Sequence, residues 1–286
     1  MKRSGFLRVF LPRGLAVILA AGLGLTAAAQ AGEVQVAVAA NFAGPLARIG
    51  EAFSASTGHK LVVSVGATGK FYSQIQAGAP FEVLIGADDE TPKKLIAAGL
   101  AVSGSNFTYA IGKLVLWSAR PGFVDADGQV LAGKGFEHLA IANPKIAPYG
   151  AAALEVLKAR GLRDAVAAKL VTAESISQAY QFVSTGNAEL GFVALSQVLG
   201  AGPPQTQDAP PGGKAPQATR GSSGSAVPDK PVVGSYWLVP AALYGEIRQD
   251  AVLLTTGDKN PAARALLDYL KSAPAKAVIT AYGYGH

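Results

Sequence analysis

The sequence predicts an α/β protein of two lobes, each a mostly parallel sheet flanked by helices. Runs rich in β-branched residues alternate with segments of helical period twice along the chain, from 33 to 99 and from 139 to 194. Between these two series, the strand-like stretch 108–117 can carry the chain out of the first lobe. Strand, helix and strand repeated at this spacing give a parallel sheet covered by helices.

The first series begins with a strand at 34–39. The helix after it has Leu46, Ile49 and Phe53 on one face, and Pro45 suits its first turn. The remaining elements are strands at 60–65 and 83–86 and helices at 71–77 and 93–98, the last of them stopped by Gly99.

The second series leads into a helical C-terminus. Its expected elements are strands at 139–142, 170–172 and 190–194 and helices at 151–159 and 176–183. Ordered structure resumes at 236–239. The final helix has Asn260 as its N-cap, with Pro261 behind it. Its buried face is formed by Leu266, Leu267 and Leu270.

These elements divide the chain into lobe 1, residues 32–112 with 238–286, and lobe 2, residues 113–237. Within lobe 2, residues 201–231 are rich in Pro, Gly, Ser and Gln and have little to bury, which predicts a flexible surface insertion. Ligands of such sheets bind beyond the carboxyl ends of the strands, so we expect the binding site in the cleft between the lobes.

Residues 1–31 have the three-part layout of a secretory signal peptide. Four basic residues and no acidic one accompany an apolar run at 15–25, and small residues lead to Ala31. The run is shorter than the ~20 residues of a membrane span. A lipoprotein would need a cysteine, which the sequence lacks. The sequence therefore predicts export and a mature protein that is free in the periplasm.

Composition excludes several classes of site. The formal net charge of +6 includes the four basic residues of the signal segment, so the mature chain carries only +2, too little for a nucleic-acid footprint. The absence of cysteine excludes disulfides and thiolate metal sites. His59, His138 and His286 are too scattered for a cationic metal site. We expect no cofactor and no nucleic-acid partner.

Four strand-to-helix junctions are small or neutral polar and carry no acid or base. They are 39–42 (AANF), 66–69 (GATG), 148–150 (PYG) and 175–177 (SIS). The start of a helix presents unpaired backbone N–H groups and the positive end of the helix dipole, so each junction is a candidate anion donor. Ordinary helix caps have the same composition, and each junction taken alone is open to that interpretation.

Enzymatic chemistries fit the sequence poorly. Residues 66–70 (GATGK) match half of a phosphate-binding P-loop, but Ser64 stands where that pattern needs its first glycine and Phe71 where it needs a hydroxyl. Asp88 and Asp89 follow a buried strand and are interpreted as solvated or capping acids. The sequence has no paired carboxylates, nucleophile elbow or histidine cluster, so we do not expect an enzyme.

Longer segments carry a specific resemblance. They are 39–42, 66–69, 74–75 (QI), 78–80 (GAP), 87–88 (AD), 109–118 (YAIGKLVLWS), 146–150 (IAPYG) and 186–197 (GNAELGFVALSQ). On these segments the chain resembles the periplasmic molybdate-binding proteins of ABC transporters, from residue 33 to the C-terminus apart from 201–231. The resemblance implies a two-lobed periplasmic binding protein of type II. Such a protein captures molybdate, or tungstate, between its lobes and delivers it to a membrane permease.

The resemblance also implies which residues contact the oxyanion. They are Ala40, Asn41, Thr68, Tyr149 and Ile176, the last through its backbone N–H. The family often has Ser or Thr where this chain has Ala40, so that position offers only its main-chain N–H. One branch of the family has a binding Tyr where this chain has Ala194, and Tyr149 is expected to supply the hydroxyl instead.

Alternative functions stay open on the sequence. A carrier for sulfate, phosphate or another tetrahedral oxyanion would use the same kind of site. A periplasmic enzyme acting on phosphate esters would need an acid–base pair that we do not find, and a sensor that contacts a membrane kinase would bind the same ligand. The sequence does not rank molybdate against tungstate. We expect a monomer.

We expect export to remove residues 1–31, because Ala29 and Ala31 occupy the small-residue positions before the cut. Intact-mass measurement of the protein from a periplasmic fraction should give a chain that begins at Gly32. A chain that retains the whole segment would contradict a freely diffusing carrier.

Overall fold

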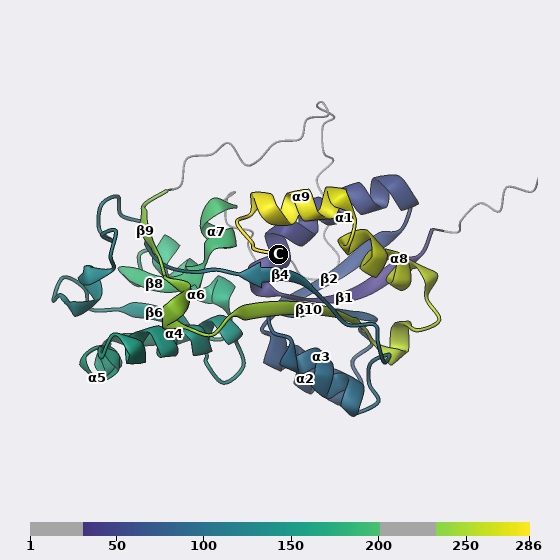
Figure 1. The fold of residues 1–286 in the computed structure, drawn as a ribbon, viewed down its shortest axis with the longest axis horizontal. Helices are drawn as coiled ribbons and strands as arrows, with labels where there is room; N and C mark the ends of the chain where they lie inside the picture. Colours follow the sequence, from purple (N-terminus) through teal and green to yellow (C-terminus); the bar gives the residue numbers. More distant parts are fainter. Residues whose placement is uncertain (1–30, 201–232) are drawn as a thin grey trace, which may run out of the picture.

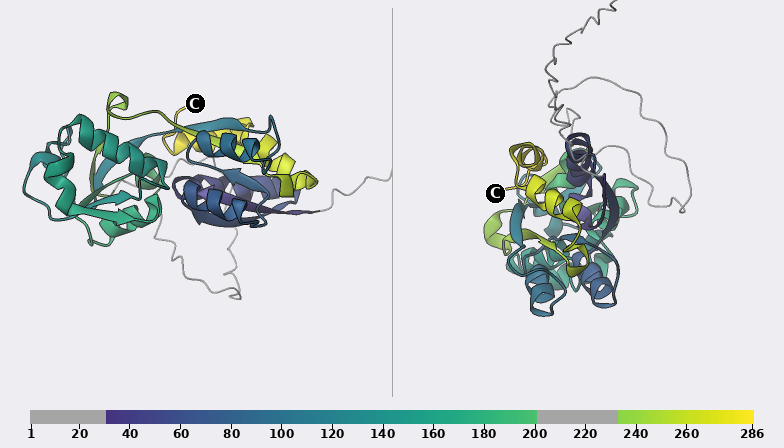
Figure 2. Two further views of the ribbon diagram at one scale, coloured as in Figure 1. Left: turned by 90° about the horizontal axis from the view of Figure 1, so that it is seen from below. Right: turned by 90° about the vertical axis from the view of Figure 1, so that its right-hand side faces the viewer.

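The computed structural model describes residues 31–200 and 233–286. The expected insertion at 201–231 lies outside these residues, as does the expected signal peptide apart from Ala31. The described chain forms two five-stranded sheets, each flanked by helices, which lie side by side as two lobes (Figures 1 and 2). The predicted α/β fold of two lobes is confirmed.

The first sheet has the order β2-β1-β3-β10-β4. Its strands are β1 (Glu33–Ala39), β2 (Lys60–Gly66), β3 (Val83–Ile85), β4 (Phe107–Gly112) and β10 (Ile247–Leu253). Strand β1 is parallel to β2 and β3, and β10 is antiparallel to both β3 and β4. On one face lie α1 (Ala43–Thr57), α8 (Pro261–Leu270) and α9 (Ala273–Ala281), and on the other α2 (Thr68–Gln76) and α3 (Glu90–Ala97) (Figure 1).

The inner strands of this sheet are buried on both faces because they are apolar on both sides, whereas the edge strand β2 is largely exposed. Val36 and Val38 pack into the core that includes the apolar residues of α1 and α8, whereas Ala37 belongs to the core around Phe71 of α2. Such alternation follows from the two-residue period of a strand. As predicted, Asn260 caps α8, its side chain accepting a hydrogen bond from the Ala262 N–H at 3.0 Å.

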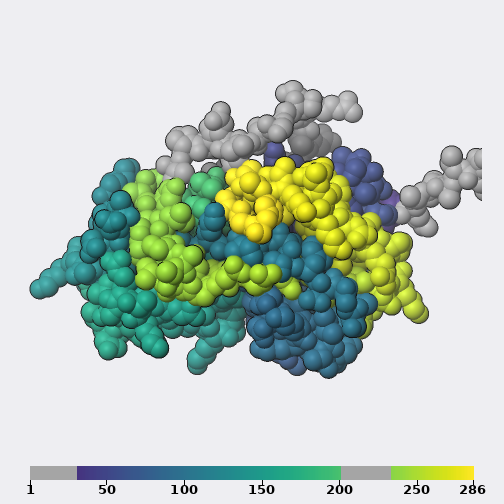
Figure 3. Space-filling model, in the orientation of Figure 1, coloured from purple at the N-terminus to yellow at the C-terminus, as the bar shows by residue number. Residues whose placement is uncertain are grey.

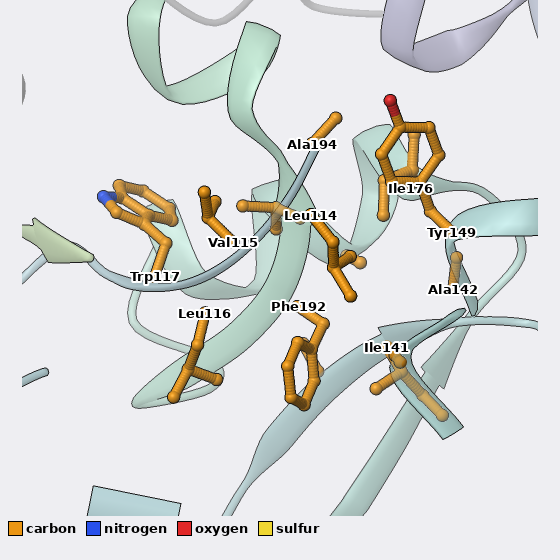
Figure 4. Close-up of a cluster of buried hydrophobic side chains, with 14 of the residues drawn as sticks. Leu114, Val115, Leu116, Trp117, Ile141, Ala142, Tyr149, Ile176, Phe192 and Ala194 are labelled. Carbon is orange, nitrogen blue, oxygen red and sulfur yellow. The ribbon is translucent and has the colours of Figure 1, made fainter. Parts of the chain in front are cut away.

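The second sheet has the order β7-β6-β8-β5-β9. Its strands are β5 (Leu114–Ser118), β6 (Leu139–Ala142), β7 (Leu170–Ala173), β8 (Leu190–Ala194) and β9 (Ser235–Leu238). Strand β6 is parallel to β7 and β8, and β5 is antiparallel to β8 and β9. The helices of this lobe are α4 (Pro148–Ala159), α5 (Arg163–Val166), α6 (Ile176–Ser184) and α7 (Leu195–Leu199). Figure 4 shows part of its core, around Leu114, Ile141 and Phe192.

Two segments cross between the lobes. The stretch 108–117, predicted as one long strand, is in fact two strands: β4 and β5 belong to different sheets and break at Lys113. The second crossing leads from β9 to β10 over the surface (Figure 3). We propose the division into 32–112 with 238–286 and 113–237 for the lobes, because these sets supply the strands of the two sheets apart from Leu238, the last residue of β9.

Several boundaries differ from the sequence prediction. Helix α2 begins at Thr68 and not at 71, and α4 begins at Pro148 and not at 151. Their first turns contain small or polar residues, which carry no apolar period. Strand β10 and helices α5, α7 and α9 were not predicted at all. Short 3₁₀ turns complete the described chain: η1 (Ala40–Phe42), η2 (Gln129–Ala132), η3 (Ala167–Lys169), η4 (Ala241–Leu243) and η5 (Thr255–Gly257). Within 31–200 and 233–286, no helix has the length and apolar character needed to cross a membrane.

Candidate functional site

A small pocket lies where the two lobes meet. Its lining comes from both lobes and from the ends of five strands or the turns that follow them. The eleven lining residues are Ala39, Ala40, Asn41, Gly66, Ala67, Thr68, Ala87, Ala147, Pro148, Tyr149 and Ile176. The structure thus brings together at one place all five residues that the sequence analysis singled out.

Helix starts from both lobes point their first residues at this pocket. Ala40 and Asn41 begin the 3₁₀ turn η1, Thr68 is the first residue of α2, and Tyr149 and Ile176 are at the starts of α4 and α6. The first backbone N–H groups of a helix have no acceptor within the helix. Each start also carries the partial positive charge of the helix dipole. The pocket therefore offers neutral donors in a positive field.

None of the eleven lining residues carries a charge. Lys70, in the first turn of α2, is charged, but it forms an exposed ion pair with Glu174 of the other lobe, with 3.8 Å between Nζ and Oε2. Asp88 follows the lining residue Ala87, but its carboxylate accepts hydrogen bonds from the Thr91 N–H and hydroxyl, and burial raises its pKa. Among the residues the structure describes, no group of three His, Asp or Glu side chains could hold a metal ion.

Thr68 and Asn41 both line the pocket, but their side-chain donors are used differently. The Thr68 hydroxyl accepts a hydrogen bond from the Ala87 N–H at 2.9 Å, which leaves its hydrogen available to an acceptor in the pocket. The Asn41 amide Nδ2 donates to Gln249 Oε1 at 2.8 Å and to the Tyr284 hydroxyl at 3.0 Å, both behind the pocket wall. Asn41 is 2% exposed. Its amide is part of a buried network.

The Tyr149 hydroxyl also belongs to that network. It accepts a hydrogen bond from Gln249 Nε2 at 3.0 Å, and it points away from the core residues Phe192 and Ile141 (Figure 4). Burial raises the pKa of Tyr149 and of Tyr109 well above the usual range of a phenol. Both hydroxyls therefore stay protonated and neutral at physiological pH.

Direct hydrogen bonds hold the two lobes together around the pocket. The Gly69 N–H donates to the Ile146 carbonyl at 2.9 Å. The Ser177 hydroxyl donates to the Ala40 carbonyl at 3.2 Å, and the Ser196 hydroxyl donates to the Asn41 carbonyl at 2.9 Å. These bonds satisfy the carbonyl groups of Ile146, Ala40 and Asn41, which lie in or beside the pocket lining. They describe a closed arrangement of the lobes.

Sequence reasoning missed Ala87, Ala147 and Gln249 as parts of this site. Ala87 and Ala147 lie within matched segments and next to the polar junctions, so their position along the chain was an available signal. Gln249 gave none, because it lies between Arg248 and Asp250 in a stretch that has no clear apolar period.

Comparison with known proteins gives a consistent result. The chain matches the family model of bacterial extracellular solute-binding proteins over residues 34–285. It is 57% identical to the molybdate-binding protein ModA of Azotobacter vinelandii, over 95% of this chain and 96% of that protein. It is 49% identical to ModA of Rhodobacter capsulatus, with the same coverage. The solved structure of an Azotobacter vinelandii periplasmic molybdate-binding protein superposes with a TM-score of 0.77 at 40% identity, covering 88% of this chain and 99% of that one.

Gly69→Ala should disturb the contact between the lobes. A Cβ at this position would lie 2.9 Å from the backbone Cα of Ile146, too close for the Gly69–Ile146 hydrogen bond to persist. We expect small-angle scattering to report a larger radius of gyration for this variant than for the unchanged protein. Gly135→Ala is the matched control, since a Cβ there would meet nothing within 4 Å. Equal radii for Gly69→Ala and the unchanged protein would show that the lobes close without this contact.

Proposed function

We infer that the chain belongs to the bacterial extracellular solute-binding proteins and, among them, to the periplasmic molybdate-binding proteins. We propose that it captures molybdate or tungstate in the pocket between its lobes. It then delivers the oxyanion to the permease of an ABC transporter. We propose that it is exported with removal of residues 1–31 and acts as a monomer that performs no catalysis.

The observation that carries this proposal is the meeting of four helix or turn starts on one uncharged pocket. A dianion held by neutral donors avoids a buried salt bridge, whose desolvation cost can exceed its Coulomb gain. Hydrogen bonds to a charged acceptor contribute about 1.5–3 kcal/mol each, so a handful supports tight binding. The site therefore suits a small oxyanion that carries its charge on several oxygens.

We assign the donors residue by residue. Ala40, Asn41, Tyr149 and Ile176 contribute backbone N–H groups, and Thr68 contributes its N–H and its hydroxyl. Tyr149 was expected to contribute a hydroxyl as well. We favour its backbone N–H, because its hydroxyl is bonded to Gln249 and lies against Gly112, where even a Cβ would collide with it.

Sulfate and phosphate carriers are the alternatives within this class. Their oxyanions are smaller than molybdate, so some donors of a pocket shaped for molybdate would be stretched. An enzyme acting on phosphate esters would need a nucleophile or an acid–base pair at the pocket. The lining instead consists of Ala, Gly, Pro, Ile, Asn, Thr and Tyr, and its tyrosine is neutral.

Thermal unfolding in the presence of candidate oxyanions tests the proposal. A ligand at 100 times its dissociation constant adds about 2.7 kcal/mol to the free energy of unfolding, which is a readily measured shift. We expect molybdate and tungstate to stabilise the protein at micromolar concentration, and sulfate, phosphate and chromate to do so less. Stabilisation by sulfate or phosphate alone would assign the chain to one of the alternative carriers.

Thr68→Ala should weaken molybdate binding about tenfold to 150-fold, because a lost hydrogen bond to a charged acceptor costs about 1.5–3 kcal/mol. Thr68→Ser retains the hydroxyl and should stay within a few-fold of the unchanged protein in calorimetric titration. Lys70→Ala and Asp89→Ala should likewise change the affinity only a few-fold, because both charges lie in exposed pairs. Loss of binding in Lys70→Ala with an unaffected Thr68→Ala would indicate a counter-charged phosphate-type site.

A further inference from the structure

A chain of buried polar side chains runs behind the pocket wall and joins the two lobes. Asn41 contacts Gln249, and Gln249 contacts Tyr149 of the other lobe. The Tyr109 hydroxyl lies 2.9 Å from Gln249 Oε1 and 2.7 Å from the Gly86 carbonyl, and the Tyr284 hydroxyl lies 3.0 Å from Asn41 Nδ2. Gln249 is 0% exposed. The polar atoms of this network therefore need buried partners, which come from one another, from neighbouring backbone or side-chain groups such as the Gly86 carbonyl, or from the pocket.

With the donors and acceptors as just described, this network of side chains leaves one acceptor without a donor. Asn41 Oδ1 is buried and has no hydrogen-bond partner among the described residues. Because Nδ2 faces Gln249 and Tyr284, Oδ1 is the amide atom left for the pocket that Asn41 lines. Tyr109 is also overcommitted, since its single hydroxyl hydrogen cannot serve both the Gly86 carbonyl and Gln249 Oε1. An amide oxygen aimed at a bound oxyanion would repel it.

The opposite assignment of these hydrogen bonds gives Asn41 Oδ1 a donor and relieves Tyr109 of its second acceptor. Turning both amides by 180° exchanges their nitrogen and oxygen while the neighbouring atoms keep their positions. Gln249 Nε2 then donates to Asn41 Oδ1 and to the Tyr109 hydroxyl, which donates to the Gly86 carbonyl. The Tyr149 hydroxyl donates to Gln249 Oε1. The Tyr284 hydroxyl turns its hydrogen from the Asn41 backbone carbonyl, 2.8 Å away, to Asn41 Oδ1, while the Ser196 hydroxyl still donates to that carbonyl at 2.9 Å. The two hydrogens of Asn41 Nδ2 become free to face the pocket.

We propose that Gln249 is a positioning residue. It holds the Asn41 amide in the turned orientation, so that Asn41 Nδ2 becomes a side-chain donor to the bound oxyanion. The inference rests on the oxyanion-binding function proposed above. It adds a basis for selectivity. Molybdate and tungstate accept at every oxygen, whereas phosphate retains a proton near neutral pH and would present a donor to a donor at this position.

The backbone around Gln249 is built for this contact. Strand β10 has a register irregularity at Gln249 and Asp250, which lets both residues be buried in succession. On the neighbouring strand β4, a Cβ at Gly112 would collide with both the Tyr149 hydroxyl and Gln249 Nε2. Glycine at that position therefore permits the hydrogen bond between the lobes.

A double-mutant cycle tests the proposal. Calorimetry with molybdate should show at least about tenfold weaker binding for Asn41→Ala and for Gln249→Met, which keeps the side-chain length. The double variant should bind no more weakly than Asn41→Ala alone, because Gln249 acts through Asn41. The preference for molybdate over phosphate should fall in Gln249→Met. Thr108→Val, which removes a hydrogen bond to Asp250 on the same pair of strands, is the control and should stay within about twofold.

Two independent losses that add in the double variant, or an unchanged preference over phosphate, would overturn the role of Gln249. Failure of the unchanged protein to bind molybdate would overturn the proposed function instead. If Gln249→Met does not fold, nitrogen-15 NMR of the unchanged protein decides the matter. Molybdate should shift the Asn41 side-chain amide hydrogens and slow their exchange with solvent, and hydrogens that neither shift nor slow would contradict the proposal.

Discussion

The arrangement of the whole molecule follows from one requirement, that backbone N–H groups at helix starts need acceptors. In each lobe the parallel strands end toward the other lobe, and the helices that follow these strands begin there. Bringing the lobes together buries the starts of η1, α2, α4 and α6 around one pocket. A buried donor without a partner is costly, so the closed arrangement calls for an acceptor among them, and the helix dipoles favour one that carries negative charge. The same helix starts therefore determine both how the lobes meet and which class of ligand the pocket binds.

Small residues let the lobes come this close. Gly69 places its N–H on the Ile146 carbonyl with no room for a side chain, and Gly112 does the same for the contact between Tyr149 and Gln249. Ala87 and Ala147 keep the pocket walls short of bulk. The low content of charge at the junctions has the same origin, since an ionised side chain would have to be desolvated when the lobes close.

The sequence predicted those parts of the fold that repeat a simple period. Both βα series, the cap at Asn260 and the exact span of the strand 190–194 agree with the structure. Helix starts were placed late at α2 and α4, because Thr68 and Tyr149 belong to polar first turns. The four neutral junctions were recognised individually from composition. That they share one site followed only from the family resemblance, and the structure places residues of all four on one pocket.

Strand β10 could not be predicted, because the buried polar residues that serve the site also interrupt its apolar pattern. It is an interior strand of the first sheet, between β3 and β4, where an apolar run is expected, yet it buries Gln249 and Asp250. Local pattern fails where a buried polar residue serves a site and not the core. Gln249 spans the distance between Asn41 and Tyr149, and no property of the sequence near position 249 refers to either of them. Such a residue is recognised only when the donors and acceptors of the structure are matched, because Gln249 acts on the pocket through its hydrogen bonds to Asn41 and Tyr149.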